Sequence, residues 1–215
     1  MTVKYDGSTT KPVNAKTYVV TVDVTAGSTY GPVTNLYIGE FTVNKATMTS
    51  SNITIADMTW TGKQIKPTSF IFNGKSYPIA GNATVGKVGV NKNIGLGTIE
   101  LTGVGANFEG NAVISFKILP KVNKVSKITR GKAKMTVKWT KVSKAQKVSG
   151  YDVWYRQVGT TAWIKKTYKA SKSSVTFKKL LKGQKYEVQV RSFKTISGTR
   201  FESAWSPVKI SGLIM

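Results

Sequence analysis

The sequence lacks two residue types on which much protein chemistry depends: none of its 215 residues is a cysteine or a histidine. Without cysteine there is no disulfide bond, no thiolate metal site and no thiol nucleophile. Without histidine the chain lacks the commonest general base and the commonest metal ligand. Its nine carboxylates are scattered, and it contains no nucleophile elbow or calcium loop. We therefore expect no enzyme, no metal site and no cofactor; a serine–lysine pair is the one catalytic arrangement left open.

Long apolar segments are also absent. No stretch approaches the roughly 18 consecutive apolar residues of a membrane-spanning helix, and residues 1–20 lack the apolar run of a signal peptide. The chain is therefore expected to have no membrane span. It is either a soluble cytosolic protein or part of a longer chain whose signal and anchor lie outside this sequence. The repeat described below favours the second interpretation.

Negative charge is scarce, and positive charge is concentrated at one end of the chain. Lysine and arginine total 33 against nine acids, a net charge of +24. Residues 121–215 hold 23 basic and three acidic side chains, whereas residues 1–46 hold four and three and residues 47–120 hold six and three. Such a field favours polyanionic partners. Only four of the basic residues are arginines, so diffuse, salt-sensitive attraction is better supported than specific readout of nucleic-acid bases.

Alternation with a period of two residues is typical of β-strands, and it dominates this sequence. Asn73-Gly74 is a strong signal for a two-residue hairpin, because a type I′ turn needs positive φ at both positions. Many short strands separated by turn residues favour β-sandwiches, so we predict an all-β fold. The clearest predicted strands cover residues 17–24, 36–43, 69–72, 98–101 and 112–118.

Two parts of the chain resemble each other. Residues 15–22 are similar to residues 95–102, and residues 41–43 are similar to residues 116–118. The second copy has an upstream half, residues 47–93, for which the first copy has no counterpart. Residues 1–46 are therefore predicted to be the C-terminal part of a truncated module, with an open strand edge and an uncovered apolar face that could pair with another copy. Chance likeness of two β-rich segments is the alternative.

The central segment carries an ordered series of turns and strands at residues 60–67 (WTGKQIKP), 91–98 (NKNIGLGT) and 102–110 (TGVGANFEG). Over about 60 residues it resembles an Ig-like, glycine-rich repeat of Gram-positive bacterial surface proteins. Residues 1–46 look like the end of a related module, although Lys16 stands where that pattern has glycine. The resemblance implies an Ig-like repeat at residues 47–120.

The last segment resembles a fibronectin type III domain over about 90 residues, 121–215. The motifs that carry the resemblance are MTVKW at 135–139 with a core tryptophan, GYDVWYR at 150–156, the L-x-x-G-x-x-Y spacing that ends at Tyr186, and SAWS at 203–206. The resemblance implies that the hydroxyl of Tyr186 bonds back to the backbone and that residues 203–206 form the last strand. It also implies an extracellular, non-catalytic array of tandem Ig-like and fibronectin type III β-sandwich modules.

Strand parity in this domain points to one face rich in aromatic and arginine side chains. Asp152, Trp154, Arg156 and Arg191 are expected on an exposed sheet face, with Trp163 and Trp205 nearby. Glu187 is expected to form a surface pair with Arg156 or with a neighbouring lysine. Such a face is either a platform for a sugar or protein partner or a structural stack in which cations cover ring faces. Half of a W-S-x-W-S box at residues 203–206 favours the structural stack.

A second candidate face is basic. Lys138 and Lys178 are expected to point outward on the opposite sheet, because Val137, Trp139 and Phe177 alternate inward. This face either docks on teichoic acid or another wall polyanion, or is a solvated surface that discourages edge pairing.

Three functional interpretations follow. The first and preferred one is a non-catalytic spacer or adhesion region of a larger surface or secreted protein, with an anionic wall polymer, a glycan or a host surface protein as partner and self-association through residues 1–46 as a further option. The second is a set of carbohydrate-binding accessory modules of a secreted glycosidase, which requires Trp154 and Trp163 to be exposed and coplanar. The third and weakest is nucleic-acid binding, which needs exposed aromatics interleaved with basic residues. Phage virion proteins also carry such modules, so a phage origin stays open beside a bacterial one.

Overall fold

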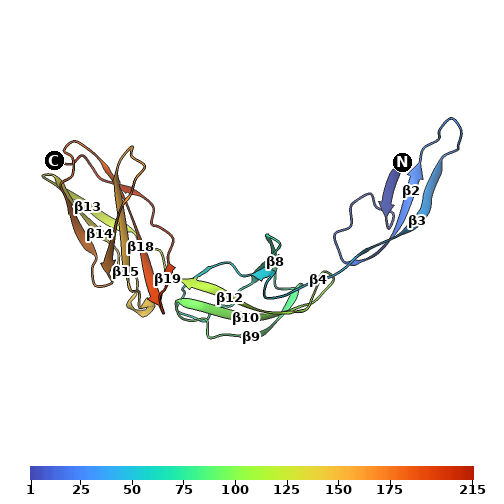
Figure 1. Ribbon diagram of the computed structural model, residues 1–215, viewed down its shortest axis with the longest axis horizontal. Coiled ribbons are helices and arrows are strands. Elements are labelled where there is room, and N and C mark those ends of the chain that lie inside the picture. The colour runs from blue at the N-terminus through green and yellow to red at the C-terminus, as the bar shows by residue number, and fades with distance from the viewer. The chain divides into compact units, whose positions relative to one another are not determined.

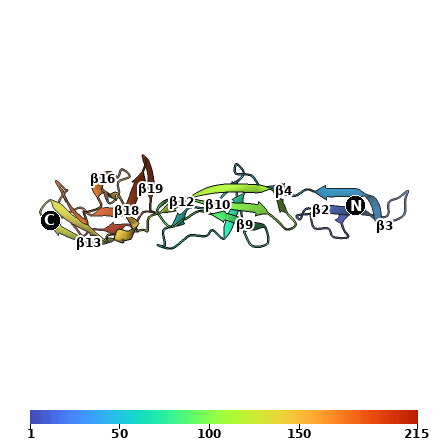
Figure 2. The same ribbon diagram turned by 90° about the horizontal axis from the view of Figure 1, so that it is seen from below.

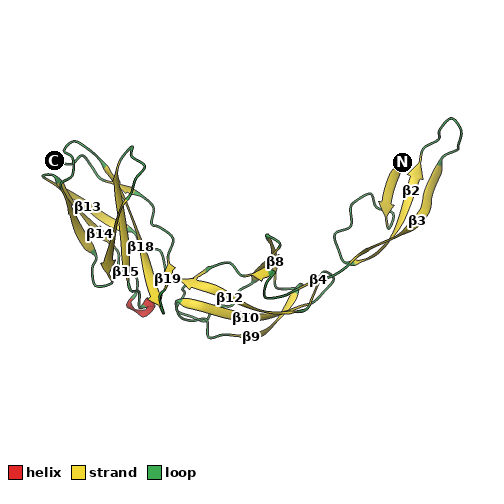
Figure 3. Cartoon of the chain, viewed as in Figure 1, coloured by secondary structure: helices red, strands yellow, loops and turns green.

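The computed structural model describes residues 1–215, and strands make up nearly all of its regular structure (Figures 1 and 3). The one helical element is the 3-10 helix η1 (Lys144–Gln146), drawn in red in Figure 3. The predicted all-β class is confirmed. None of the helical structure is long and apolar enough to pass through a bilayer.

The chain divides into two compact units. The first comprises Met1–Ile55, Pro67–Lys87 and Ile99–Ile114, and the second comprises Ala56–Lys66, Val88–Thr98 and Ser115–Met215. This division runs through the predicted central module rather than beside it. The predicted boundaries after residues 46 and 120 therefore stay predictions.

The first sheet has the strand order β1-β2-β3, with both pairs antiparallel. Its central strand alternates as the sequence predicts: Tyr18, Val20 and Val22 are buried, whereas Val19 is exposed. A bulge interrupts the register of β2 and β3 at Ile38, next to Gly39, whose φ of 143° suits glycine. The bounds are β1 (Thr2–Tyr5), β2 (Lys16–Val24) and β3 (Val33–Val43).

The central part of the chain contains a predicted hairpin. Asn73 and Gly74 have φ values of 47° and 75°, as a type I′ turn requires, and they join the antiparallel strands β7 and β8. These two strands and β5 form one sheet with the order β5-β7-β8, and β4 pairs with β11 in parallel. The bounds are β4 (Ala46–Thr47), β5 (Ile53–Thr54), β7 (Ser69–Phe72), β8 (Lys75–Pro78) and β11 (Phe108–Glu109).

A four-stranded sheet with the order β6-β12-β10-β9 contains the two longest strands of this part. Figures 1 and 2 both show β10 beside β12. The inward residues of β12 alternate strictly with exposed ones, which confirms the strand predicted over residues 112–118. The bounds are β6 (Met58–Thr59), β9 (Ala83–Val88), β10 (Gly95–Gly103) and β12 (Asn111–Leu119).

Residues 121–215 form two sheets. One has the order β13-β14-β17, and the other has the order β16-β15-β18-β19, with β20 also pairing to β18. The bounds of the first sheet are β13 (Val125–Gly131), β14 (Lys134–Trp139) and β17 (Ser174–Lys178). Those of the second are β15 (Gly150–Gln157), β16 (Ile164–Lys169), β18 (Tyr186–Ile196), β19 (Thr199–Glu202) and β20 (Lys209–Ile210).

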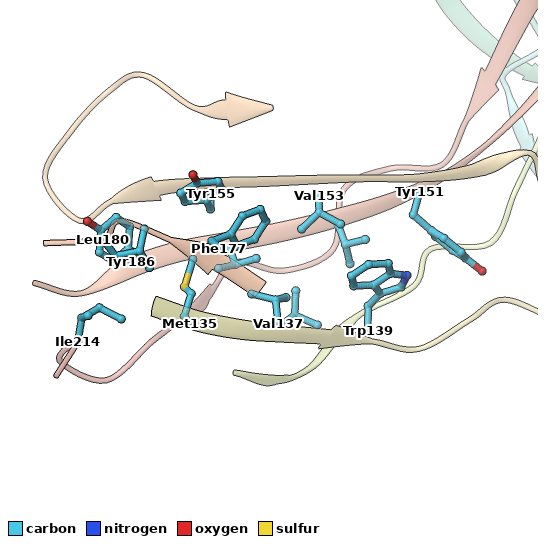
Figure 4. Close-up of a cluster of buried hydrophobic side chains, with 13 residues drawn as sticks. Met135, Val137, Trp139, Tyr151, Val153, Tyr155, Phe177, Leu180, Tyr186 and Ile214 are labelled. Carbon is cyan, nitrogen blue, oxygen red and sulfur yellow. The ribbon is translucent and has the colours of Figure 1, made fainter. Parts of the chain in front are cut away.

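The core lies between these two sheets. Figure 4 shows Met135, Val137 and Trp139 of β14 directed toward Val153 and Tyr155 of β15, and all five side chains are at most 8% exposed. The predicted core tryptophan is thereby confirmed. The rings of Tyr155 and Phe177 stack with centroids 4.0 Å apart, an arrangement that adds specificity to apolar burial.

Tyr186, the first residue of β18, behaves as the resemblance implies. The backbone N–H of Leu181 donates to the hydroxyl oxygen of Tyr186 at 3.0 Å, which ties the turn before β18 to the start of that strand. Tyr151 makes a similar contact at another turn, where its hydroxyl oxygen accepts from the N–H of Val142 at 3.1 Å. Buried hydroxyls thus cap two backbone turns of this domain.

The predicted last strand is wrong in its position. Residues 203–206 have no strand conformation, and the chain pairs with β18 through β19 before them and β20 after them. The physical reason is that serine hydroxyls take part in the contact with β18. Ser203 and Ser206 accept from the N–H groups of Ser192 and Val190 at 3.1 and 3.0 Å, and Ser211 accepts from the N–H of Tyr186 at 2.9 Å.

Candidate functional site

The predicted aromatic face is assembled on the sheet that contains β15 and β18. The rings of Trp154 and Trp205 have centroids 4.3 Å apart, and the guanidinium of Arg191 lies 4.5 Å from the Trp205 ring and 5.8 Å from the Trp154 ring. Lys165 of the neighbouring strand β16 places its ammonium 4.4 Å from the Trp154 ring. Trp154 therefore carries cations as well as a neighbouring ring.

Arg156 and Trp163 form a separate pair on the same sheet. The guanidinium of Arg156 lies 4.4 Å from the Trp163 ring, and its Nε donates to Glu187 at 2.5 Å. The register sets this ion pair, because Arg156 of β15 lies opposite Glu187 of β18. The surface pair expected between these two residues is thus present.

A network of four charged side chains extends this face toward β19. Asp152 accepts from Arg191 at 3.0 Å and from Arg200 at 2.6 Å, and Glu202 contacts both arginines at 2.6 and 2.9 Å. Thr167 also donates to Asp152 at 2.8 Å. Parity predicted an outward-facing Asp152, but the residue is only 4% exposed, because the arginines fold over it.

Arg200 was not among the site residues predicted from the sequence. It belongs to β19, which was not predicted, and its guanidinium also lies 3.7 Å from the ring of Phe193. The T-R-F-E alternation at residues 199–202 is the signal that could have revealed a strand there, since Phe201 is buried and Arg200 and Glu202 are not.

The side chains of this face mainly contact one another, as expected for a structural stack. Its carboxylates are neutralised by arginines, and its tryptophans are each partly buried and in contact with a cation. Cation–π contacts of this kind contribute about 0.5–2 kcal/mol each. The two tryptophans of the proposed sugar platform, Trp154 and Trp163, already have cations against their rings. No cluster of three or more metal-ligating side chains occurs in the chain.

The basic face lies on the sheet β13-β14-β17. Lys138 is opposite Lys127, and Lys178 is opposite Lys134, so four exposed lysines sit in two pairs. Lys134 and Lys138 are four residues apart on β14, about 13 Å at a rise of about 3.3 Å per residue. Between the pairs runs a row of threonines, and the hydroxyl oxygens of Thr136 and Thr176 in this row are 2.8 Å apart. We call Lys127, Lys134, Lys138 and Lys178 the lysine face.

Charge is segregated between the two sheets. The strands β13, β14 and β17 contain five basic residues and no acidic one. The three carboxylates of residues 121–215, those of Asp152, Glu187 and Glu202, all lie on the other sheet, where arginines engage them. The lysine face therefore has no carboxylate on its own strands to neutralise it.

A further basic feature lies at the loop after β14. A hollow of about 310 Å³ is lined by Lys141, Lys144 and Lys147, with Val148 and Tyr151 among its apolar walls. These three lysines were not among the site residues predicted from the sequence. Their recurrence at every third position around η1 is the signal that could have done so.

The comparisons with known proteins concern the same part of the chain. The family model of the fibronectin type III domain matches residues 120–209, so this segment is a fibronectin type III domain. A solved structure titled "Myokine structure" is 17% identical, with a TM-score of 0.36, and covers 43% of this chain and 96% of that one. The structure of the fn3 domain of human contactin 1 is 14% identical, with a TM-score of 0.38, and covers 44% and 79%. The search of curated proteins finds no match.

Proposed function

We propose that the chain is a non-catalytic array of β-modules in a larger extracellular or cell-surface protein, and that its lysine face docks on an anionic polymer of a Gram-positive cell wall. The fibronectin type III domain and the all-β fold support a modular, non-catalytic role. The Ig-like character of residues 1–120 and the bacterial origin are parts of this proposal.

The observation that carries the proposal is the segregation of charge. Four exposed lysines on three adjacent strands project from one sheet, whose strands hold no acid. Lysine ammoniums are compact point charges on flexible stems, and they suit diffuse attraction to a repeating polyanion rather than planar recognition. Wall teichoic acid is the expected partner, because its phosphates repeat along a flexible chain.

The test is co-sedimentation of the full chain with purified Gram-positive walls, prepared with and without teichoic acid, across a salt series. Binding is expected to need the teichoic acid and to weaken as salt is raised, because exposed charges are screened over about 10 Å at 0.1 M salt. If each lysine contributes about 1 kcal/mol near an anionic surface, replacing the four by glutamine weakens binding roughly 10²–10³-fold.

A matched variant separates the lysine face from net charge. Replacement of Lys11, Lys45, Lys66 and Lys92 by glutamine removes the same charge from exposed positions in residues 1–120. This control variant is expected to bind walls nearly as well as the parent chain. Equal loss of binding in the two variants would show that net charge alone, and not the lysine face, determines wall binding. Equal binding to walls with and without teichoic acid would exclude teichoic acid as the partner.

A further inference from the structure

The first sheet ends in an unprotected edge. Strand β3 has β2 on one side, and the sheet order places no strand on its other side. Its 11 residues, VTNLYIGEFTV, include no lysine and no proline, the two residues that most often protect an edge. Beyond the bulge at Ile38, residues 39–43 pair regularly with β2. This short stretch therefore presents an ordered row of backbone donors and acceptors.

The apolar face of the same sheet has a thin cover. Tyr18, Val20 and Val22 of β2 are buried, and the rings of Tyr5 and Phe41 meet edge to face above them, with centroids 6.0 Å apart. Phe41 is itself 47% exposed, and Val33 and Leu36 on the same strand are 42% and 49% exposed. The side chains that cover the centre of the sheet thus remain half in contact with solvent.

The chain contains a more complete version of the same arrangement. Strands β9, β10 and β12 follow the order of β1, β2 and β3, and residues 116–118 of β12 resemble residues 41–43 of β3. The outer edge of β12 carries β6, which pairs in parallel at Ile118 and Leu119. The corresponding end of β3 has no such strand, so an added strand would complete the edge.

Charge and symmetry indicate which partner fits. Residues 1–46 are nearly neutral, with four basic and three acidic side chains, so they offer little electrostatic attraction to a polyanion. Residues 39–43 contain one charged side chain, Glu40. If two such stretches run antiparallel about a two-fold axis at Phe41, Glu40 of each faces Thr42 of the other, and no like charges meet. Both half-exposed Phe41 rings then come together.

We propose that two copies of the chain pair through β3, antiparallel over residues 39–43 and centred on Phe41, to form a continuous six-stranded sheet. Such an isologous contact uses the same surface on both copies and closes after two. It satisfies the backbone groups of the open edge and removes the half-exposed Phe41 rings from water. The lysine face has no part in this contact, so the two proposals stand or fall separately.

Sedimentation equilibrium of the full chain, from about 1 µM to 1 mM, tests the assembly. The expected result is a rise from 23.4 kDa to twice that mass as concentration increases. Phe41→Lys is expected to return the chain to a monomer, whereas Ile164→Lys, which changes an equally exposed residue of β16, is expected to leave the dimer intact. A monomer at every concentration, or a dimer that survives Phe41→Lys, would overturn the proposal.

Single cysteines test the register without a disruptive charge, since these 215 residues include no cysteine. Residues that face each other across antiparallel strands have Cα atoms about 4.5–5.5 Å apart, within the range that a disulfide bridges. Phe41→Cys is expected to give a covalent dimer under mild oxidation. Val19→Cys, on the exposed face of the central strand β2, is the control and is expected to stay monomeric on a denaturing gel. Equal cross-linking of both variants would exclude the proposed pairing.

Discussion

In this domain, serine hydroxyls accept hydrogen bonds from backbone N–H groups that backbone carbonyls would accept in a regular sheet. The hydroxyl of Ser206 accepts from the N–H of Val190, which is fully buried, and donates in turn to the carbonyl of Pro207, both at 3.0 Å. Ser203 and Ser211 repeat the arrangement, each donating to the carbonyl of the following residue. The irregular segment between β19 and β20 is thereby fixed to β18 at three points.

Replacement of Ser206 by alanine is expected to destabilise the domain by about 1–3 kcal/mol, because the buried N–H of Val190 loses its acceptor. Urea denaturation, followed by tryptophan fluorescence, measures the change in the free energy of unfolding. Ser126→Ala, at an exposed position of β13, is the control and is expected to change stability by less than about 0.5 kcal/mol. Equal stability of the two variants would contradict the assigned role of the serine.

Asp152 offers a second test at the level of the residue. Its side chain is 5% exposed, and its carboxylate bonds to two arginines whose side chains are 19% and 37% exposed. Asp152→Asn leaves both guanidiniums without that partner, at an expected cost of about 1–3 kcal/mol, less than for a fully buried pair because solvent screens the arginines.

A double-mutant cycle of Asp152→Asn and Arg200→Gln, with unfolding free energies measured in urea, isolates the pair. A coupling energy of about 0.5–3 kcal/mol is expected for groups in one network. Strict additivity of the two changes would show that the network contributes nothing beyond its separate members.

At the scale of strands, alternation was sufficient to locate most of the regular sheet. The predicted strands at residues 17–24, 69–72 and 112–118 agree with β2, β7 and β12 within one residue at each end. These strands each bury one face, so their apolar residues recur at every second position. The pattern alone also indicated which side chains of β14 enter the core.

Predictions from period-two alternation are wrong where side chains take the place of backbone pairing, and where one charged side chain covers another. Residues 203–206 resembled a strand, but serine hydroxyls bond to β18 there instead of a regular ladder. Asp152 lies on the predicted outer face, yet Arg191 and Arg200 cover it. Both features depend on pairs that are distant in sequence, and one unaligned sequence contains no record of such pairs.

The buried tyrosines of the fibronectin type III domain predict that its folding stability falls at alkaline pH. Burial raises the pKa of the Tyr151, Tyr155 and Tyr168 hydroxyls above the ordinary value of 10.0. A raised pKa in the folded state means that the folded state binds these protons more tightly than the unfolded state does. The resulting stabilisation is fully present below pH 10 and is lost as pH rises through the folded-state pKa values.

Tyrosinate absorbance and circular dichroism, recorded together from pH 8 to about pH 12, measure this effect. Part of the tyrosinate signal is expected to appear only with loss of the β-sheet spectrum, because the buried hydroxyls ionise on unfolding. Tyr155→Phe is expected to reduce the amplitude of that late step. Titration of all nine tyrosines before any loss of structure would contradict the assignment.

At the scale of the whole molecule, the distribution of charge separates two kinds of module. Residues 121–215 hold 23 of the 33 basic side chains, while residues 1–46 are nearly neutral and expose apolar side chains. A strongly charged domain resists association with copies of itself, whereas a neutral open sheet favours it. The two proposed contacts, one with a polyanion and one with a second copy, therefore belong to different parts of the chain.

The same difference predicts unequal stability along the chain. The sheet β1-β2-β3 is covered mainly by its own half-exposed side chains, whereas β18 lies in a two-sheet core in which Val188 and Val190 are fully buried. Three strands are about the minimum for a sheet that is stable by itself, and they need a packed apolar face, which is only thinly covered here. At concentrations where the chain is monomeric, hydrogen exchange of the amides in residues 18–24 is expected to be at least about tenfold faster than in residues 186–190. Protection should rise with concentration in residues 39–43, where the edge pairs with a second copy. Equal protection of the two strands in a monomer would show that residues 1–46 form a complete module.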